Sequence, residues 1–189
     1  FWKYSNHQYK AMKNAYAGHL KYSFQLRPHT VADQAYIGAY QGIGVGYFNF
    51  GNPEELGNPL AVYLFQGGRI AQFSPRISLN YEWNFGASFG WKPYDEYDNP
   101  ENQIIGSKVN AYLNVNLYLK WALSPKFDLM IGTTGSHFSN GNTQYPNSGL
   151  NTVDCKVGLV YNLTAERMNS PSHGNTLSFL HSPATSATT

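Results

Sequence analysis

The chain has 189 residues, which is enough for one domain with a substantial core. Charged residues make up only 13 % of it and the formal net charge is +2, so we expect no nucleic-acid partner. The single cysteine excludes an internal disulfide and a cysteine-rich metal site, and the 6 histidines show no metal-ligand spacing. We therefore expect no metal and no cofactor.

The first third of the chain has the pattern of β-structure. It predicts strands at about 17–27, 35–50 and 60–66. Within 35–50, glycines occupy the even positions from Gly42 to Gly46, and the odd face carries Ile37, Ala39, Ile43, Val45 and Tyr47. A glycine face leaves room inside a narrow barrel. The longest apolar run, Leu60 to Phe65, is far shorter than the roughly 18 residues that a membrane-spanning helix needs.

The middle of the chain shows the strictest alternation. From Ile77 to Trp91 every odd position is apolar and every even position is polar or small, and Val109 to Trp121 repeats the pattern. Period-two alternation predicts strands with one apolar and one polar face. Trp91 and Trp121 stand at strand ends, as expected for the aromatic girdles that flank the apolar band of a membrane barrel.

The last third predicts two more strands and a tail. The strands lie at about 126–139 and 151–163. Alternation stops at Thr164, and the remaining residues are rich in Ser, Thr and Pro. We therefore expect a barrel domain at 1–163 and a disordered polar tail at 164–189.

The number of predicted strands is one short of an even-numbered barrel. Seven strands are clear, whereas single-chain bacterial barrels have an even number. We therefore expect an eighth strand, either truncated before Phe1 or within Phe1 to Tyr16. The chain begins without Met and shows no signal peptide, which predicts a processed start or a fragment.

These features predict an all-β, antiparallel, up-and-down transmembrane β-barrel of eight strands. A soluble sandwich or barrel also alternates. However, typical strands have about 5–6 residues, and the strands predicted here are much longer. The polar face also carries Asn, Gly, Ser and Tyr rather than the Lys and Glu of a solvated surface. Glu82, Lys108 and Lys120 on that face are expected to be interior hydrogen-bonding partners.

The segment from Gly135 to Leu150 holds the candidate chemistry. His137 and Ser139 lie two residues apart on a strand, so they share a face, and they are in phase with the apolar residues before them. A hairpin that pairs Ser139 with Asn151 brings all three side chains to one outward patch. A serine nucleophile needs a base, and the base needs an orienting group. The simpler interpretation is that the pair contacts lipid headgroups.

The motif His137-Phe138-Ser139-Asn140, followed by Pro146-Asn147 and Gly149-Leu150, resembles the lipid A 3-O-deacylase family, which includes acyloxyacyl hydrolase-like outer-membrane proteins. The resemblance implies an eight-stranded barrel in the Gram-negative outer membrane that removes the ester-linked 3-position acyl chain of lipid A. Its partners would be lipopolysaccharide and membrane lipid, and homo-oligomerisation stays open.

The resemblance also implies roles for individual residues. Ser139 would be the nucleophile and His137 the general base. Asn140 would help to form the oxyanion hole, with backbone amides around Gly141. The family places an acid where this chain has Asn151, which can orient an imidazole but cannot stabilise an imidazolium by charge.

Two other functions remain open from the sequence. The first is a non-catalytic outer-membrane barrel with a structural or lipid-binding role, and Asn151 is its best support. The second is a soluble lipocalin-like carrier with an apolar interior. Such a carrier would stay in solution without detergent, which a membrane-extraction test would reveal.

Overall fold

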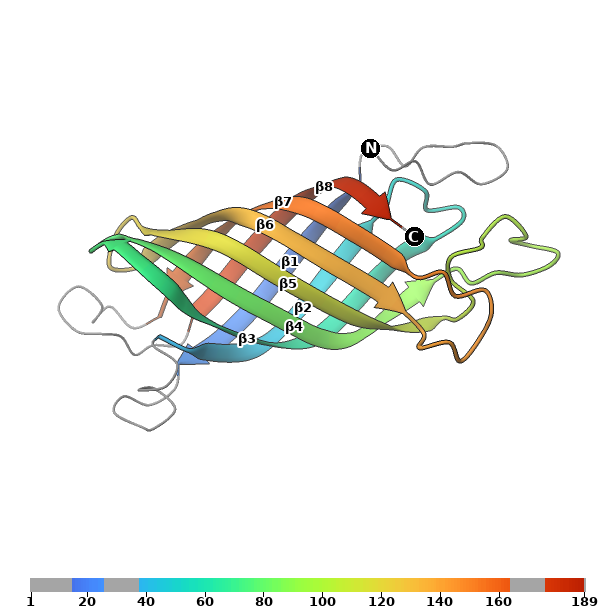
Figure 1. Ribbon diagram of the computed structural model, residues 1–189, viewed down its shortest axis with the longest axis horizontal. Coiled ribbons are helices and arrows are strands. Elements are labelled where there is room, and N and C mark those ends of the chain that lie inside the picture. Colours follow the sequence, from blue (N-terminus) through green and yellow to red (C-terminus); the bar gives the residue numbers. More distant parts are fainter. Residues whose placement is uncertain (1–14, 26–37, 164–175, 189) are drawn as a thin grey trace.

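The computed structural model describes residues 15–25, 38–163 and 176–188, and the regular elements within these ranges are strands (Figure 1). The strands are β1 (Tyr16–Gln25), β2 (Tyr40–Asn49), β3 (Gly57–Ser74), β4 (Ile77–Trp91), β5 (Val109–Ala122), β6 (Phe127–Ser139), β7 (Leu150–Asn162) and β8 (Thr176–Thr188). Each pairs antiparallel with the next, and β8 also pairs with β1, which closes the barrel. The prediction of an all-β, antiparallel, up-and-down barrel is confirmed.

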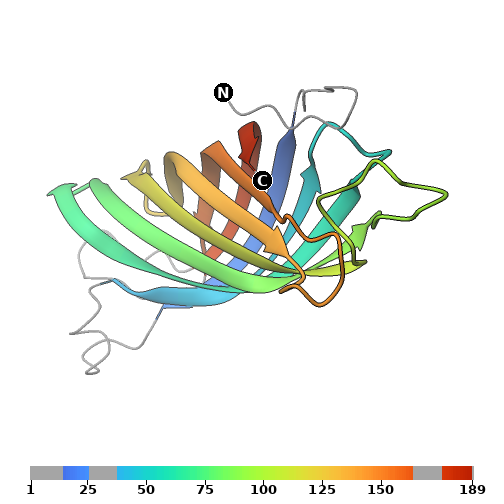
Figure 2. The ribbon, with the colours of Figure 1, turned by 45° about the vertical axis from the view of Figure 1, so that its right-hand side comes forward.

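The two ends of the barrel differ in their connections. Residues 50–56, 92–108 and 140–149 connect strands at one end, which lies to the right in Figures 1 and 2 and is here called the loop end. At the opposite turn end, residues 75–76 join β3 to β4 and residues 123–126 join β5 to β6. Nowhere in the described ranges is there a helix long and apolar enough to cross a membrane.

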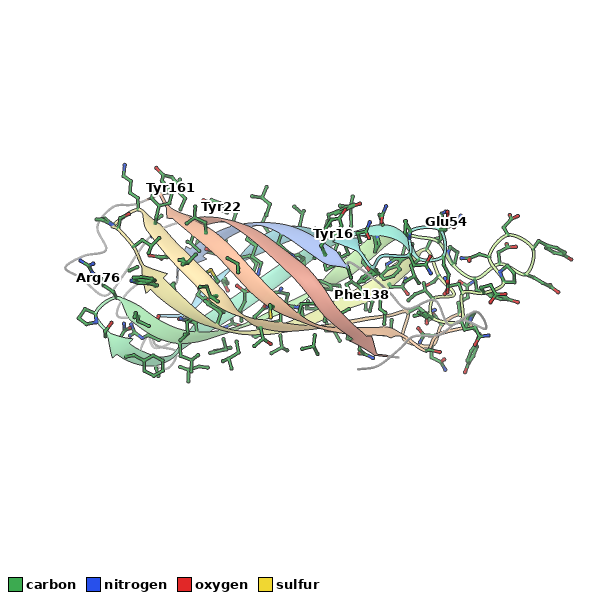
Figure 3. All side chains as sticks on the ribbon, turned by 90° about the horizontal axis from the view of Figure 1, so that it is seen from above. Tyr16, Tyr22, Glu54, Arg76, Phe138 and Tyr161 are labelled. Carbon is green, nitrogen blue, oxygen red and sulfur yellow. The ribbon has the colours of Figure 1, made fainter. Side chains whose placement is uncertain are left out.

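The alternation read from the sequence sorts side chains to the two faces of the sheet. In β5, Val115 is 66 % exposed whereas the next residue, Asn116, is 2 % exposed. The same alternation runs along β2, β4, β6 and β7. Figure 3 shows the outward side chains projecting from the strands along the length of the barrel. The outer wall is therefore apolar, and the buried polar side chains of these strands face the lumen, the arrangement of a membrane barrel.

A charged cluster fills the middle of the lumen. Glu82 on β4 accepts hydrogen bonds from Lys21 on β1 and, at 3.1 Å, from the Tyr40 hydroxyl on β2. Lys156 on β7 lies 3.6 Å from the same carboxylate and donates to Asn116 at 2.9 Å. The predicted interior role of Glu82 is confirmed. Lys120 is half-buried. Lys108 is exposed because it precedes the first paired residue of β5, so the interior role predicted for Lys108 is wrong.

Aromatic rings fill the lumen at the loop end. Phe50 stacks on Trp91, and both rings contact Phe138 edge-on at 5.6 Å and 5.2 Å between centroids. Trp91 is only 4 % exposed, so its predicted place in an outer girdle is wrong. Gly90 before it has a positive φ of 85°, and the register between β3 and β4 shifts here, which turns the indole inward. Trp121, at the turn end, faces outward as predicted.

The closing strand lies where the sequence predicts a tail. β8 occupies residues within the segment 164–189, so the expectation of disorder is corrected over Thr176–Thr188. Backbone pairing to both β1 and β7 forms this strand, although its sequence alternates only briefly at Leu177 and Phe179. The prediction of a strand before or within Phe1 to Tyr16 falls on residues that, up to position 14, lie outside the described ones.

Candidate active site

The candidate site lies at the loop end, where β6 finishes and β7 begins. His137 and Ser139 have the outward phase of β6, and Asn151 has the outward phase of β7. The register pairs His137 directly with Asn151, two residues away from the predicted pairing of Ser139 with Asn151. A two-residue difference preserves the face, so all three side chains still lie on the outer wall.

Two hydrogen bonds connect these side chains in a row. His137 Nε2 lies 2.9 Å from Ser139 Oγ, and His137 Nδ1 lies 2.7 Å from Asn151 Oδ1. An amide oxygen can only accept, so Nδ1 is protonated and its N–H donates a hydrogen bond to Asn151 Oδ1. Nε2 then has a free lone pair and accepts from the serine hydroxyl. This tautomer is the one in which an imidazole can remove a proton from Ser139.

The site is set in an apolar wall. Ala111 on β5 pairs with Ser139, and Leu113 pairs with His137. Leu113 is 44 % exposed, whereas the three polar side chains are half-buried. Phe138, between His137 and Ser139, points into the lumen and is fully buried among the aromatic rings. The packed Phe138 therefore anchors the strand from inside while its two neighbours face outward.

A turn follows Ser139 directly. The Asn140 N–H donates to the Asn147 side chain at 3.1 Å, and the Asn140 amide nitrogen donates to the Gln144 carbonyl at 2.7 Å. Among the described residues, Asn140 Oδ1 is buried without a hydrogen-bond partner. Gly141 has a positive φ of 64°, and among the described residues no atom lies within 4 Å of a Cβ built on it. The structure thus places Asn140 and Gly141 next to the nucleophile candidate, with part of the Asn140 amide already engaged in the turn.

Gly149 lies beside the site, although its sequence position predicted no role for it. A Cβ built on Gly149 would lie 3.2 Å from His137 Cε1 and 3.7 Å from the Ser139 Cβ. Its φ of 72° is also one that side chains rarely adopt. The sequence signal that could have indicated a role for Gly149 is its place in the Gly149-Leu150 part of the motif, two residues before Asn151. Only the folded hairpin shows that its backbone lies beside the imidazole.

No cluster of three or more metal-ligating side chains occurs within the described ranges. The groups at the site are a hydroxyl, an imidazole and a carboxamide, which together support nucleophilic attack with general-base assistance. Such an arrangement suits acyl transfer from an ester.

Comparison with known proteins adds one finding. The family model described as lipid A 3-O-deacylase (PagL) matches residues 1–160 of the chain. The matched part contains β1 to β6, most of β7, and all of the residues placed at the candidate site. A comparison with curated proteins finds no match.

Proposed function

Because the chain belongs to the lipid A 3-O-deacylase family of bacterial outer-membrane hydrolases, we propose that it removes the 3-position acyl chain of lipid A with Ser139 as its nucleophile. The observation that carries the proposal is the hydrogen-bonded row from Ser139 through His137 to Asn151 on the outer wall. A serine esterase of this kind needs neither a metal nor a cofactor.

The row supports a two-step acyl transfer. Ser139 Oγ attacks the ester carbonyl carbon while His137 Nε2 takes the hydroxyl proton. The tetrahedral intermediate collapses, and the sugar oxygen leaves with the proton from Nε2. The acyl chain is then an ester of Ser139. A water molecule, deprotonated by His137, attacks that ester, and collapse returns the proton to Ser139 and releases the fatty acid.

The turn after Ser139 offers donors for the developing oxyanion. The Gly141 N–H and the Asn140 side-chain amide lie in this turn, at the position where the family resemblance implies an oxyanion hole. The open space beside Gly141 would admit the substrate oxygen. Each such donor is worth about 10²–10³ in kcat in a well-studied serine protease.

The outward direction of the site fits a substrate that resides in the membrane. An ester just below the lipid headgroups would meet Ser139 at the rim of the apolar wall without leaving the bilayer. Outer-membrane barrels have longer extracellular loops and shorter periplasmic turns. Of the described connections, the long ones lie at the end of the barrel that holds the site, so we assign the loop end to the outer leaflet of a Gram-negative outer membrane.

A second function, a barrel that binds lipid without turnover, is favoured by one observation. Asn151 stands where the family is expected to have an acid, so an imidazolium at His137 would lack a charged partner. The two functions differ in whether acyl chains are released at all.

Mass spectrometry of lipid A separates them. The purified barrel, reconstituted with lipopolysaccharide, should release a 3-hydroxy fatty acid, and the lipid should lose the corresponding mass. Ser139→Ala should lower the rate by at least about 10³-fold while the barrel still folds, since the nucleophile is removed. Equal release by wild type and Ser139→Ala would refute an enzyme that acts through Ser139, and no release by wild type would favour the non-catalytic barrel.

A further inference from the structure

We infer that the connection 92–108 holds the catalytic hairpin in its reactive geometry, with Asn102 as the positioning residue, an inference that rests on the proposed function. This connection comes from β4 and β5, whereas the hairpin belongs to β6 and β7. Figure 1 shows the two segments side by side at the loop end. The contacts between them reach the side of the imidazole.

Asn102 fixes the fold of this connection. It is fully buried, and its side-chain oxygen accepts from the N–H groups of Ile104 and Ile105, each at 3.0 Å. Its amide nitrogen donates to the Lys92 carbonyl at 2.7 Å and to the Glu55 carbonyl at 3.2 Å. One side chain therefore ties the connection 92–108 to itself and to the connection 50–56, with every hydrogen-bonding group of the amide in use.

The segment that Asn102 holds is the one that contacts the catalytic hairpin. The Ile104 carbonyl accepts from the Gly149 N–H at 3.3 Å, and the Gln103 carbonyl accepts from the Ser148 hydroxyl at 3.0 Å. Gly149 in turn lies beside the imidazole, since a Cβ built on it would lie 3.2 Å from His137 Cε1. The path from Asn102 to the imidazole thus consists of Ile104 and Gly149 alone.

Gly106 makes a second, independent contact between the two segments. A Cβ built on it would lie 2.7 Å from the Pro146 carbonyl oxygen and from the backbone of Tyr145. The two backbones therefore touch directly, without room for a side chain. Ile104 and Ile105 are both fully buried, so this part of the connection has little freedom to move away.

This support matters because proton transfer from Ser139 to His137 tolerates only a small displacement of the imidazole. A general base must lie within hydrogen-bond reach of the proton that it removes, and a misplacement of about 1 Å can cost 10²-fold in rate. On the apolar wall, lipid would not hold the imidazole by hydrogen bonds. The hydrogen bonds to Asn151 and Ser139, together with the Gly149 backbone beside the ring, are thus what restrain the imidazole.

The test is the rate at which Ser139 reacts with a small fluorophosphonate, measured per folded barrel in detergent. The folded fraction is measured separately, by electrophoretic mobility without boiling. Asn102→Ala and Gly106→Ala should each lower the second-order labelling rate by about 10- to 100-fold, because the imidazole no longer activates the hydroxyl fully. A residue that only stabilises the fold would lower the labelled fraction and leave the rate of the folded molecules unchanged.

Two control variants match these changes. Asn99→Ala removes an amide that donates to the same Glu55 and Lys92 carbonyls but does not touch the Ile104 segment. Gly18→Ala adds a methyl group that would have no atom of the described residues within 4 Å. Both should label within about twofold of wild type, since neither reaches the hairpin.

The outcomes separate the inference from the proposed function. If wild type does not label, or Ser139→Ala labels equally fast, the proposed function fails. If wild type labels and both Asn102→Ala and Gly106→Ala label at its rate per folded barrel, only the positioning role is overturned. If neither variant folds, the connection serves folding rather than the site, which also overturns it.

Discussion

Two groups of polar side chains lie on opposite faces of the same sheet and differ in how deeply they are buried and in how their hydrogen bonds are arranged. Inside, Glu82 and its two lysines are buried, charged and bonded to one another and to neighbouring amides. Outside, His137 and Ser139 are half-buried and bonded with Asn151 in a single row that ends at the serine oxygen.

The number of hydrogen bonds to each group, and whether one of its atoms remains accessible from outside the barrel, distinguish a structural polar cluster from a candidate catalytic one. The inner cluster satisfies the carboxylate from several sides, so it holds strands together and leaves no group for a substrate. The outer row ends at the Ser139 hydroxyl, the proposed nucleophile, on the outer wall of the barrel. Changes to the inner cluster should therefore alter stability, and changes to the outer row should alter rate.

The largest stability effect is expected at Glu82. Glu82→Gln would leave two buried lysines without their counter-ion, which should lower the free energy of unfolding by about 3–5 kcal/mol. Urea unfolding of barrels folded into lipid vesicles would measure it. The control is Glu54→Gln, because Glu54 is exposed in the connection 50–56 and its loss should change the unfolding free energy little.

Deacylation per folded molecule should be unchanged in Glu82→Gln. The carboxylate lies in the lumen, and the described contacts link it to Lys21, Tyr40, Asn116 and Lys156 rather than to the outer row. A variant that kept its stability but lost deacylation would break the distinction between the two clusters.

A smaller effect, on rate alone, is expected at Asn151. Asn151→Ala removes the acceptor that holds the Nδ1 proton, so kcat should fall by about 10- to 100-fold, the value of a lost hydrogen bond at 1–3 kcal/mol. Asn151→Glu should raise kcat above wild type, because a carboxylate stabilises the imidazolium as well as orienting the ring. Steady-state deacylation of folded barrels measures both.

Cys155→Ala is the matched control on the same strand and face, and it should leave kcat unchanged. If Asn151→Ala also deacylates at the wild-type rate, the side chain does not orient His137 and the row reduces to a pair.

Much of the fold follows from the sequence because alternation is a local signal. The runs Ile77 to Trp91 and Val109 to Trp121 predicted strands β4 and β5 to within one residue, and the same parity placed His137 and Ser139 on the outer face. Parity survives a register difference of two residues, which is why the predicted pairing of Ser139 with Asn151, although wrong, still placed the three side chains on one patch.

The rest depends on contacts that no local pattern records. Trp91 turned inward because the register shifts beside Gly90, and one irregularity reverses the parity of everything after it. β8 forms through backbone pairing rather than through its own alternation. The contact of Ile104 with Gly149 joins two hairpins, so nothing near either residue in the sequence could indicate it.

The most direct test compares two serines on the same strand. Ser139 lies on the outer wall beside His137, whereas Ser136 faces the lumen and accepts from Asn114 at 2.8 Å. Deacylation of lipopolysaccharide by Ser139→Ala and Ser136→Ala, each reconstituted and corrected for folded fraction, measures which face does the chemistry. We predict a loss of at least about 10³-fold for Ser139→Ala and a wild-type rate for Ser136→Ala. Equal rates in the two variants, or a loss confined to Ser136→Ala, would contradict a catalytic outer wall.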